Sequence, residues 1–207
     1  MDARLRHWLL SSVVPFTKML GHLHSPYSHK LIHKSDVDAA LAILKPGMGF
    51  VTRTEGELTN LFIPGYWSHC AVYVGGGFVM EAIGKGVAKT DLTDFLMGKD
   101  HAMILRPLFA NDAQMAKAAA WSLTQEGLPY DYEFEGGSKK FYCAMLYYAA
   151  LKVGMDGQSP FTLRETWGVQ TVTPDDFPNA KDKIAQELLL PASPAAQTAT
   201  EQPSSAA

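Results

Sequence analysis

Short runs of β-branched and aromatic residues, separated by glycine, fill the middle of the chain. Such runs are typical of strands, and the brief connections between them favour antiparallel pairing of neighbours. The pattern predicts five strands: GFVTRT (49–54), HCAVYVG (69–75), FVMEAIG (78–84), GVAKT (86–90) and AMILRP (102–107). We therefore expect an antiparallel sheet of about five strands.

Apolar residues that recur at three- to four-residue spacing predict helices before and after these strands. The first helix is expected to have Ser35 as its N-cap and to end at Lys45-Pro46-Gly47. The last is apolar and is closed by Gly154. The predicted helices are 35–44, 94–97, 113–125 and 142–153. A sheet packed against these helices gives an α+β domain.

The N-terminal segment carries an apolar stripe that suits an amphipathic helix, with Pro15 as an expected kink. The members of the stripe are Leu5, Trp8, Leu9, Val13, Phe16, Leu20 and Leu23. Two alternatives stay open: a helix packed on the body of the protein, or an interfacial helix that lies on a membrane. We expect residues 1–34 to be an N-terminal amphipathic helical segment, residues 35–190 the folded domain, and residues 191–207 a disordered tail.

Composition narrows the class of protein. A chain of 207 residues that is 47% hydrophobic is long enough for one buried core. A net charge of −3 and the lack of a Lys/Arg-rich run argue against a nucleic-acid partner. No run reaches the roughly 18 apolar residues that a spanning helix needs. Arg4 and Arg6 precede a short apolar run as in a signal peptide, but no small-x-small cleavage site follows. A cytoplasmic or membrane-associated location is therefore favoured over secretion.

The cysteine and histidine content gives no framework for a disulfide scaffold or a metal. Cys70 and Cys143 are the only cysteines, so a reactive thiol is more plausible than a disulfide scaffold. His22 and His24 could share a metal, but no cysteine or acidic partner stands at ligand spacing. We expect no metal and no cofactor.

Strand alternation separates the candidate base His69 from its chain neighbour Cys70. Successive strand residues point to opposite faces, so His69 shares its face with Ala71 and Tyr73, while Cys70 lies on the other face. His69 and Cys70 therefore cannot act as base and nucleophile. Cys70 is most simply a small buried hydrophobic residue.

The triple-glycine loop decides whether Glu81 joins His69. A three-residue loop would pair Val74 with Phe78. It would also pair Ala71 with Glu81, which would place Glu81 on the face of His69 and within reach of the imidazole. A two-residue loop would put the two side chains on opposite faces. The role of Glu81 therefore depends on strand register.

Cys143 stands at the expected start of an apolar helix, behind a Gly-Gly-Ser-Lys-Lys stretch. Unpaired amides and the positive end of the helix dipole favour a thiolate there. Cys143 would attack a carbonyl, His69 would take and return a proton, and Glu81 would orient His69. The alternative is a core cysteine, a strand histidine bonded to backbone and a surface glutamate.

These residues stand in a stretch that resembles the circularly permuted branch of the NlpC/P60 papain-like superfamily, specifically the YiiX/YebB-like hydrolases. The resemblance covers roughly residues 40–178 and rests on LKPGMGF, FIPGYWSHCAVYVGGGFVMEA, GLPYDYEFEGGSKKFYCAMLYYAAL and TPDDF. In ordinary NlpC/P60 enzymes the cysteine helix precedes the histidine strand. Here the order is reversed, as in the permuted branch. The family's cysteine, histidine and polar third residue correspond to Cys143, His69 and Glu81.

The resemblance also nominates Tyr130. Leu128-Pro129-Tyr130 is similar to the Pro-Tyr that precedes the catalytic cysteine in NlpC/P60 proteins, which makes Tyr130 a candidate hydroxyl donor near the oxyanion. The alternative is a tyrosine packed at the end of the preceding helix. The chain departs from the common pattern at Ala144 and Met145, where many relatives have Ser or Thr followed by Glu. That departure puts the substrate preference in doubt.

The fold that this resemblance implies is permuted papain-like, and the activity is that of a cysteine hydrolase with a thioester acyl-enzyme. An amide bond, as in cell-wall peptides, is the expected target. Permuted relatives of the lecithin:retinol acyltransferase type act instead on lipid acyl chains, and the apolar loop at 61–67 would suit a lipid-facing entrance. A third alternative is a binding module with a vestigial site. The expected partner is a peptide or lipid acyl substrate, and peripheral membrane contact through the N-terminal helix stays open.

Overall fold

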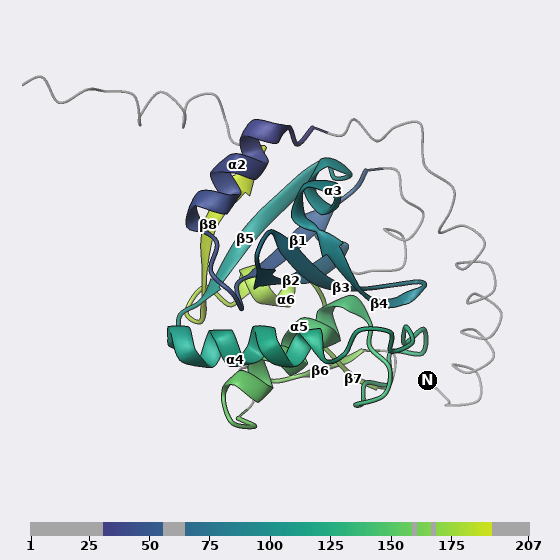
Figure 1. The fold of residues 1–207 in the computed structure, drawn as a ribbon. Helices are drawn as coiled ribbons and strands as arrows, with labels where there is room; N and C mark the ends of the chain where they lie inside the picture. The colour runs from purple at the N-terminus through teal and green to yellow at the C-terminus, as the bar shows by residue number, and fades with distance from the viewer. Residues whose placement is uncertain (1–30, 56–64, 159–160, 167–168, 192–207) are drawn as a thin grey trace, which may run out of the picture.

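A six-stranded antiparallel sheet forms the centre of the protein (Figure 1). The computed structural model describes residues 31–55, 65–158, 161–166 and 169–191. The strand order is β4-β3-β2-β1-β5-β8. The strands are β1 (Gly49–Arg53), β2 (His69–Gly75), β3 (Phe78–Ile83), β4 (Gly86–Asp91), β5 (His101–Pro107) and β8 (Ile184–Leu190). All five predicted strands are present, and the α+β class is confirmed.

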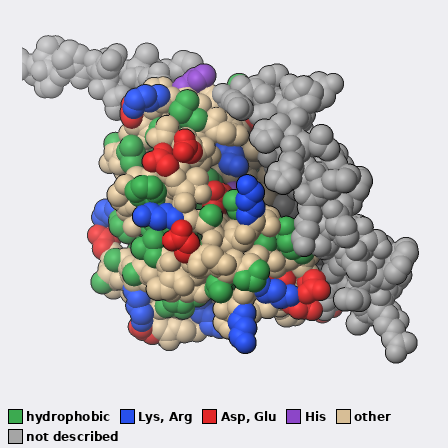
Figure 2. Space-filling model, turned by 45° about the vertical axis from the view of Figure 1, so that its right-hand side comes forward, with side chains coloured by type: hydrophobic (Ala, Val, Ile, Leu, Met, Phe, Trp, Pro, Cys, Tyr) green, Lys and Arg blue, Asp and Glu red, His purple; other side chains and the backbone are tan. Residues whose placement is uncertain are grey.

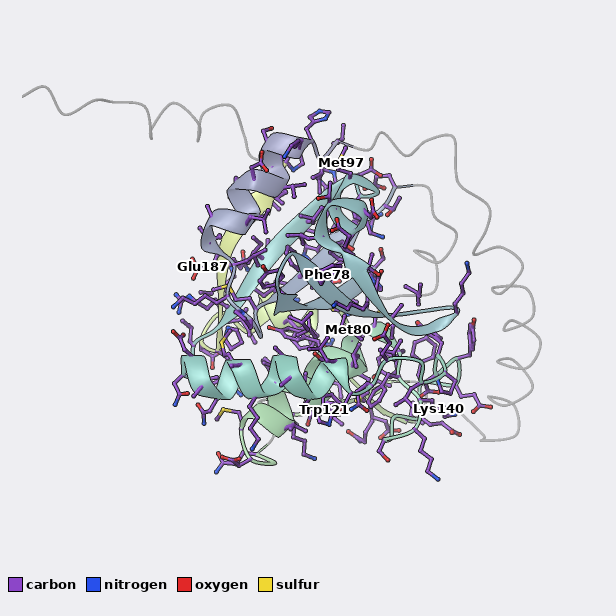
Figure 3. The ribbon with its side chains drawn as sticks, in the orientation of Figure 1. Phe78, Met80, Met97, Trp121, Lys140 and Glu187 are labelled. Carbon is purple, nitrogen blue, oxygen red and sulfur yellow. The ribbon has the colours of Figure 1, made fainter. Side chains whose placement is uncertain are left out.

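The sixth strand, β8, was not predicted from the sequence. It pairs with β5 at the edge of the sheet, where Glu187 stands as an extra residue between the partners of Ile104 and Leu105 (Figure 3). Because a bulge shifts the side chains that follow it, apolar and polar residues do not alternate along β8. The alternation that identifies a half-buried strand is therefore missing.

Helices cover both faces of the sheet (Figure 1). They are α2 (Lys34–Ile43), α3 (Leu92–Met97), α4 (Asp112–Leu123) and α5 (Cys143–Gly154). The face that carries Ala71 and Val79 packs against α2 and α3. The opposite face carries Cys70 and Met80 and packs against α4 and α5 (Figure 3). Neighbouring residues of one strand thus enter two different cores, as the period of two requires.

The N-cap of α2 corrects one prediction. The helix begins at Lys34, and its N-cap is His33 rather than Ser35. The carboxylate of Asp36, at the third helical position, accepts from the backbone N–H of His33 at 2.9 Å. That bond satisfies the backbone N–H of His33 at the start of the helix, so the hydroxyl of Ser35 is not needed as a cap.

The β2–β3 hairpin has the predicted pairing of Ala71 with Glu81, but its turn differs from the predicted three-residue loop. Phe78 pairs with Gly75 rather than with Val74, so the connection has two residues and Val74 is an extra residue on β2. A two-residue connection alone would reverse the face of every β3 side chain, and the one-residue bulge restores it. Gly75, which ends β2, and the two connecting residues Gly76 and Gly77 all have positive φ, from 62° to 89°, which suits this tight turn. Glu81 therefore lies on the same face as the histidine that starts β2.

The segment after α5 adds small elements to the α5 side of the sheet. β6 (Arg164–Thr166) and β7 (Val169–Thr171) form a two-stranded sheet, and the TPDDF stretch leads into α6 (Asp176–Asn179). Phe177 is fully buried, and its ring packs against that of Tyr147 on α5 at 4.9 Å. The TPDDF stretch is thereby fastened to the helix that Cys143 begins.

The predicted N-terminal amphipathic helix, including His22 and His24, and the predicted tail fall in residues 1–30 and 192–207, outside the described part of the chain. Within the described part, no helix is both long enough and apolar enough to span a membrane. On the face drawn in Figure 2, the described basic and acidic side chains are interspersed.

Candidate active site

Cys143 is the first residue of α5, as predicted. The chain that leads into it is fixed by two backbone hydrogen bonds. The N–H of Phe141 donates to the carbonyl of Pro129 at 3.1 Å, and the N–H of Asp131 donates to the carbonyl of Phe141 at 3.0 Å. Because the first amides of a helix have no partner within the helix, the Cys143 sulfur lies beside free donors and the positive end of the dipole.

The loop that precedes Cys143 is held in shape by Asp131. This buried carboxylate accepts from the backbone N–H of Glu133 at 3.2 Å and from that of Gly136 at 2.9 Å. Nζ of Lys140 lies 3.2 Å from Oδ1 of the same carboxylate. Asp131 therefore stabilises the turn.

A gap between β2 and β3 gives Cys143 access to the histidine. The β2–β3 ladder starts at the pair of Ala71 and Glu81, so His69 and Cys70 lie beyond its end. The backbone N–H of Cys70 is hydrogen-bonded to the sulfur of Cys143. Glu81 and α5 belong to opposite faces of the sheet, and this gap is where the first residue of α5 meets His69.

His69 connects the other two predicted residues. Its Nε2 lies 2.8 Å from Oε2 of Glu81, and its side chain also hydrogen-bonds with Cys143. Since Nε2 is engaged by the carboxylate, the contact with the sulfur is assigned to Nδ1. The His69 side chain is 16% exposed and that of Glu81 is 9% exposed, so solvent screens this pair little. The structure thus brings together all three residues, and Glu81 is not a surface glutamate.

The charges of the three groups follow from these contacts. Burial opposes protonation of His69, but hydrogen bonds with Cys143 and Glu81 outweigh it and raise the pKa of His69 to about 9. Burial opposes ionisation of Glu81, but the hydrogen bond and charge of His69 lower its pKa to about 2. Burial also opposes the thiolate, yet His69 and two backbone amides lower the pKa of Cys143. These shifts favour the thiolate of Cys143 beside a protonated His69 and an ionised Glu81.

Thr90 of β4 is a site residue that the sequence analysis missed. Its Oγ1 donates to Oε1 of Glu81 at 2.7 Å. The β3–β4 register places Thr90 opposite Val79, one diagonal step from Glu81 on the same face. The alternation along GVAKT could have nominated Thr90 if the register of this second hairpin had been known.

Tyr130 lies next to the cysteine, as the resemblance implied. Both of its chain neighbours are hydrogen-bonded to Phe141, two residues before Cys143. Burial and the nearby charge of Cys143 raise the pKa of Tyr130 well above its ordinary value. The phenol therefore keeps its proton and can donate a hydrogen bond. Its role at an oxyanion stays a prediction.

Cys70 is a core residue. Its side chain is fully buried in the cluster that contains Met80 and Leu146. Burial, reinforced by the charge of Cys143, raises the pKa of Cys70 well above the ordinary thiol value. The second thiol is thus protonated and packed, as predicted.

A turn just before β2 is fixed by a residue from the TPDDF stretch. Oδ2 of Asp175 accepts from the backbone N–H of Trp67 at 3.1 Å. Gly65 has a φ of 109°, and a Cβ there would lie 1.8 Å from the same oxygen. Only glycine fits this approach. Asp175 therefore fixes the backbone of the turn that immediately precedes β2 and His69.

Gly65→Ala should destabilise the fold and slow alkylation of Cys143 by iodoacetamide. The substitution adds left-handed strain and a clash with the Asp175 carboxylate, which together should lower the free energy of unfolding by about 2–4 kcal/mol. Gly157→Ala is the matched control, because Gly157 has a φ of 91° but no atom within 4 Å of its added Cβ. Denaturant unfolding of both variants measures the difference. Equal losses in the two variants would argue against the Asp175 contact.

Among the described residues, no group of three or more His, Cys, Asp or Glu side chains is arranged to hold a metal ion. The side chains of Cys143, His69, Glu81 and Tyr130 place a thiol, an imidazole, a carboxylate and a phenol close together. Such a constellation fits acyl transfer from a carbonyl.

The comparisons with known proteins agree with this fold. The family model described as permuted papain-like amidase enzyme, YaeF/YiiX, C92 family, matches residues 46–185. The chain is also similar to a solved structure described as metalloprotein YiiX from Escherichia coli O157:H7. That likeness has 18% identity and a TM-score of 0.55, and it covers 69% of this chain and 97% of that chain. No curated protein matches the sequence significantly. Because the family match spans more than half of the sequence and includes His69, Glu81 and Cys143, the chain belongs to the C92 family of permuted papain-like amidases.

Proposed function

We propose that this protein cleaves amide bonds of peptides through a thioester acyl-enzyme on Cys143. Membership of an amidase family gives the reaction class, which is hydrolysis at an amide bond, and argues against a binding module with a vestigial site. The observation that supports the mechanism is the position of His69 between the Cys143 sulfur and the Glu81 carboxylate. A thiolate beside an imidazolium is the nucleophile that this chemistry requires.

In the proposed acylation step, the Cys143 thiolate attacks the carbonyl carbon of the scissile amide. The backbone amide of Cys143 and the hydroxyl of Tyr130 would stabilise the oxyanion. The imidazolium of His69 then gives its proton to the leaving nitrogen, the C–N bond breaks, and an amine departs. Glu81 holds the imidazole in orientation and stabilises its charged form throughout.

In the proposed deacylation step, neutral His69 takes a proton from water as the water attacks the thioester carbonyl. The C–S bond breaks, the acid is released, and the thiolate and imidazolium are restored. No proton or electron is left over, and no external reductant or cofactor takes part in the cycle.

The substrate class we propose is a peptide, as in cell-wall peptides, and the competing candidate is a lipid acyl chain with membrane contact through the N-terminal segment. Incubation of the full chain with a panel of murein peptides and a panel of phospholipids, followed by mass spectrometry of the products, separates the two. Shorter peptides that depend on Cys143 would support the proposal. Free fatty acid or transferred acyl chains that depend on Cys143 would replace the amide substrate with a lipid.

The rate should depend on pH as a bell with its basic limb near pH 9. The reactive pair needs a thiolate and an imidazolium, so it forms as pH rises through the lowered pKa of Cys143. It is lost as pH rises through about 9, where His69 gives up its proton. The pH profile of kcat/KM on a cleaved peptide measures both limbs. A basic limb near pH 6.5, the ordinary value for histidine, would contradict the proposed ion pair.

A further inference from the structure

The carboxylate of Glu81 is held at both of its oxygens. Oε2 meets Nε2 of His69 at 2.8 Å, and Oε1 accepts from the hydroxyl of Thr90 at 2.7 Å. A glutamate on its own has three rotatable side-chain bonds, so one hydrogen bond does not fix its plane. Two hydrogen bonds to different partners leave it a single orientation.

Thr90 is well suited to hold this carboxylate. It is β-branched and lies on a strand, so its χ1 is restricted and its hydroxyl has a fixed direction. The ladder between β3 and β4 is continuous from Ile83–Gly86 to Phe78–Asp91, which keeps Thr90 in register with Glu81. The hydrogen bond from Thr90 also favours the ionised form of Glu81.

We propose that Thr90 is a positioning residue, which fixes the plane of the Glu81 carboxylate and thereby holds the His69 imidazole in its orientation toward Cys143. This inference rests on the proposed function, because it assigns Thr90 to the same site. In metal sites, residues that orient a ligating histidine or carboxylate change activity by about 10- to 100-fold when they are removed, and we expect an effect at the lower end of this range for the orientation of His69.

The chain offers a matched control for the loss of a hydroxyl. Thr52 on β1 lies directly opposite His69 in the sheet and is fully buried. Its Oγ1 has no hydrogen-bond partner among the described residues. Thr52→Val and Thr90→Val are therefore the same change at two strand positions near His69, and only the second breaks a bond to Glu81.

The test is the pH dependence of Cys143 alkylation by iodoacetamide, which needs no substrate. In Thr90→Val and in Thr90→Ala, the alkylation rate at neutral pH should fall about tenfold, and the profile should move toward the higher pH at which an ordinary thiol ionises. Thr90→Ser, which keeps the hydroxyl, should restore most of the rate, and Thr52→Val should stay within about twofold of the wild type. Denaturant unfolding of all four variants shows whether they are folded.

Each outcome decides the inference. A wild-type alkylation profile in folded Thr90→Val or Thr90→Ala would overturn it, as would an equal loss in Thr52→Val. Failure of the proposed function is seen separately, as an ordinary thiol profile for Cys143 in the wild-type protein itself. A lowered thiol pKa in the wild type together with no effect of Thr90 would remove only the role of Thr90.

Discussion

Cys143→Ala should abolish amide hydrolysis, with a loss of at least about 10⁴-fold in kcat/KM. The thiol is the group that forms the acyl-enzyme in the proposed mechanism, and alanine has no nucleophile for His69 to activate. The fold should survive, because Cys143 starts a helix whose remaining residues are packed on the sheet. Product formation on the peptide panel measures the loss.

Cys70→Ala is the control for this experiment, since it removes the other thiol of the chain and leaves the backbone amide at that position. Its side chain is fully buried in the core, so hydrolysis should persist while the free energy of unfolding falls by about 1–2 kcal/mol. Hydrolysis that survives Cys143→Ala and disappears in Cys70→Ala would reverse the assignment of the nucleophile.

His69→Gln should have the second-largest effect, a loss of about 10³-fold or more in kcat/KM. Two contributions add. The variant lacks the proposed general base, and Cys143 loses the hydrogen bond and positive charge of His69 that lower its pKa. Burial, which raises the pKa of Cys143, then dominates. The alkylation rate of Cys143 should therefore fall at neutral pH and recover only at alkaline pH.

The alkylation experiment is best done in the Cys70→Ala background, so that one thiol is followed. Its matched comparison is His101→Gln, because His101 lies on β5, paired with Arg53, and β1 separates β5 from the strand of His69. That variant should keep the wild-type pH profile. A profile of His69→Gln that also matches the wild type would mean that His69 does not activate the thiol.

Much of the site could be predicted because two of its residues obey local rules. Strand alternation excluded Cys70 as the partner of His69, and the start of an apolar helix marked Cys143. The prediction placed Glu81 on the correct face of the sheet, but the loop length on which it depended was wrong. The connection has two residues rather than three, and the bulge at Val74 restores the face that the shorter turn would have reversed. A sequence pattern does not show a bulge, because the extra residue looks like an ordinary strand residue.

Thr90 and Asp175 could not be placed from the sequence because their contacts depend on distant register. Thr90 reaches Glu81 only through the β3–β4 pairing. Asp175 binds the backbone of Trp67, 108 positions earlier in the chain. The TPDDF stretch was noticed through its resemblance to family members, and the structure gives it a physical role at the entrance to β2.

The arrangement of the site also explains how a permuted chain can keep the same set of site residues together. His69 and Glu81 come from adjacent strands and face α3, whereas Cys143 comes from the helix layer on the other face. They meet at the point where β2 and β3 stop pairing. Since the three residues belong to packed elements rather than to one connecting loop, their meeting depends on the sheet and on α5, and not on the order in which the chain visits them.

The most direct test of this account is peptide mapping of the full chain after reaction with a thiol-directed acyl probe. We predict one acyl adduct, carried by the peptide that contains Cys143, which is lost in Cys143→Ala and strongly reduced at neutral pH in His69→Gln. An adduct on Cys70, or equal labelling of the wild type and Cys143→Ala, would contradict the account.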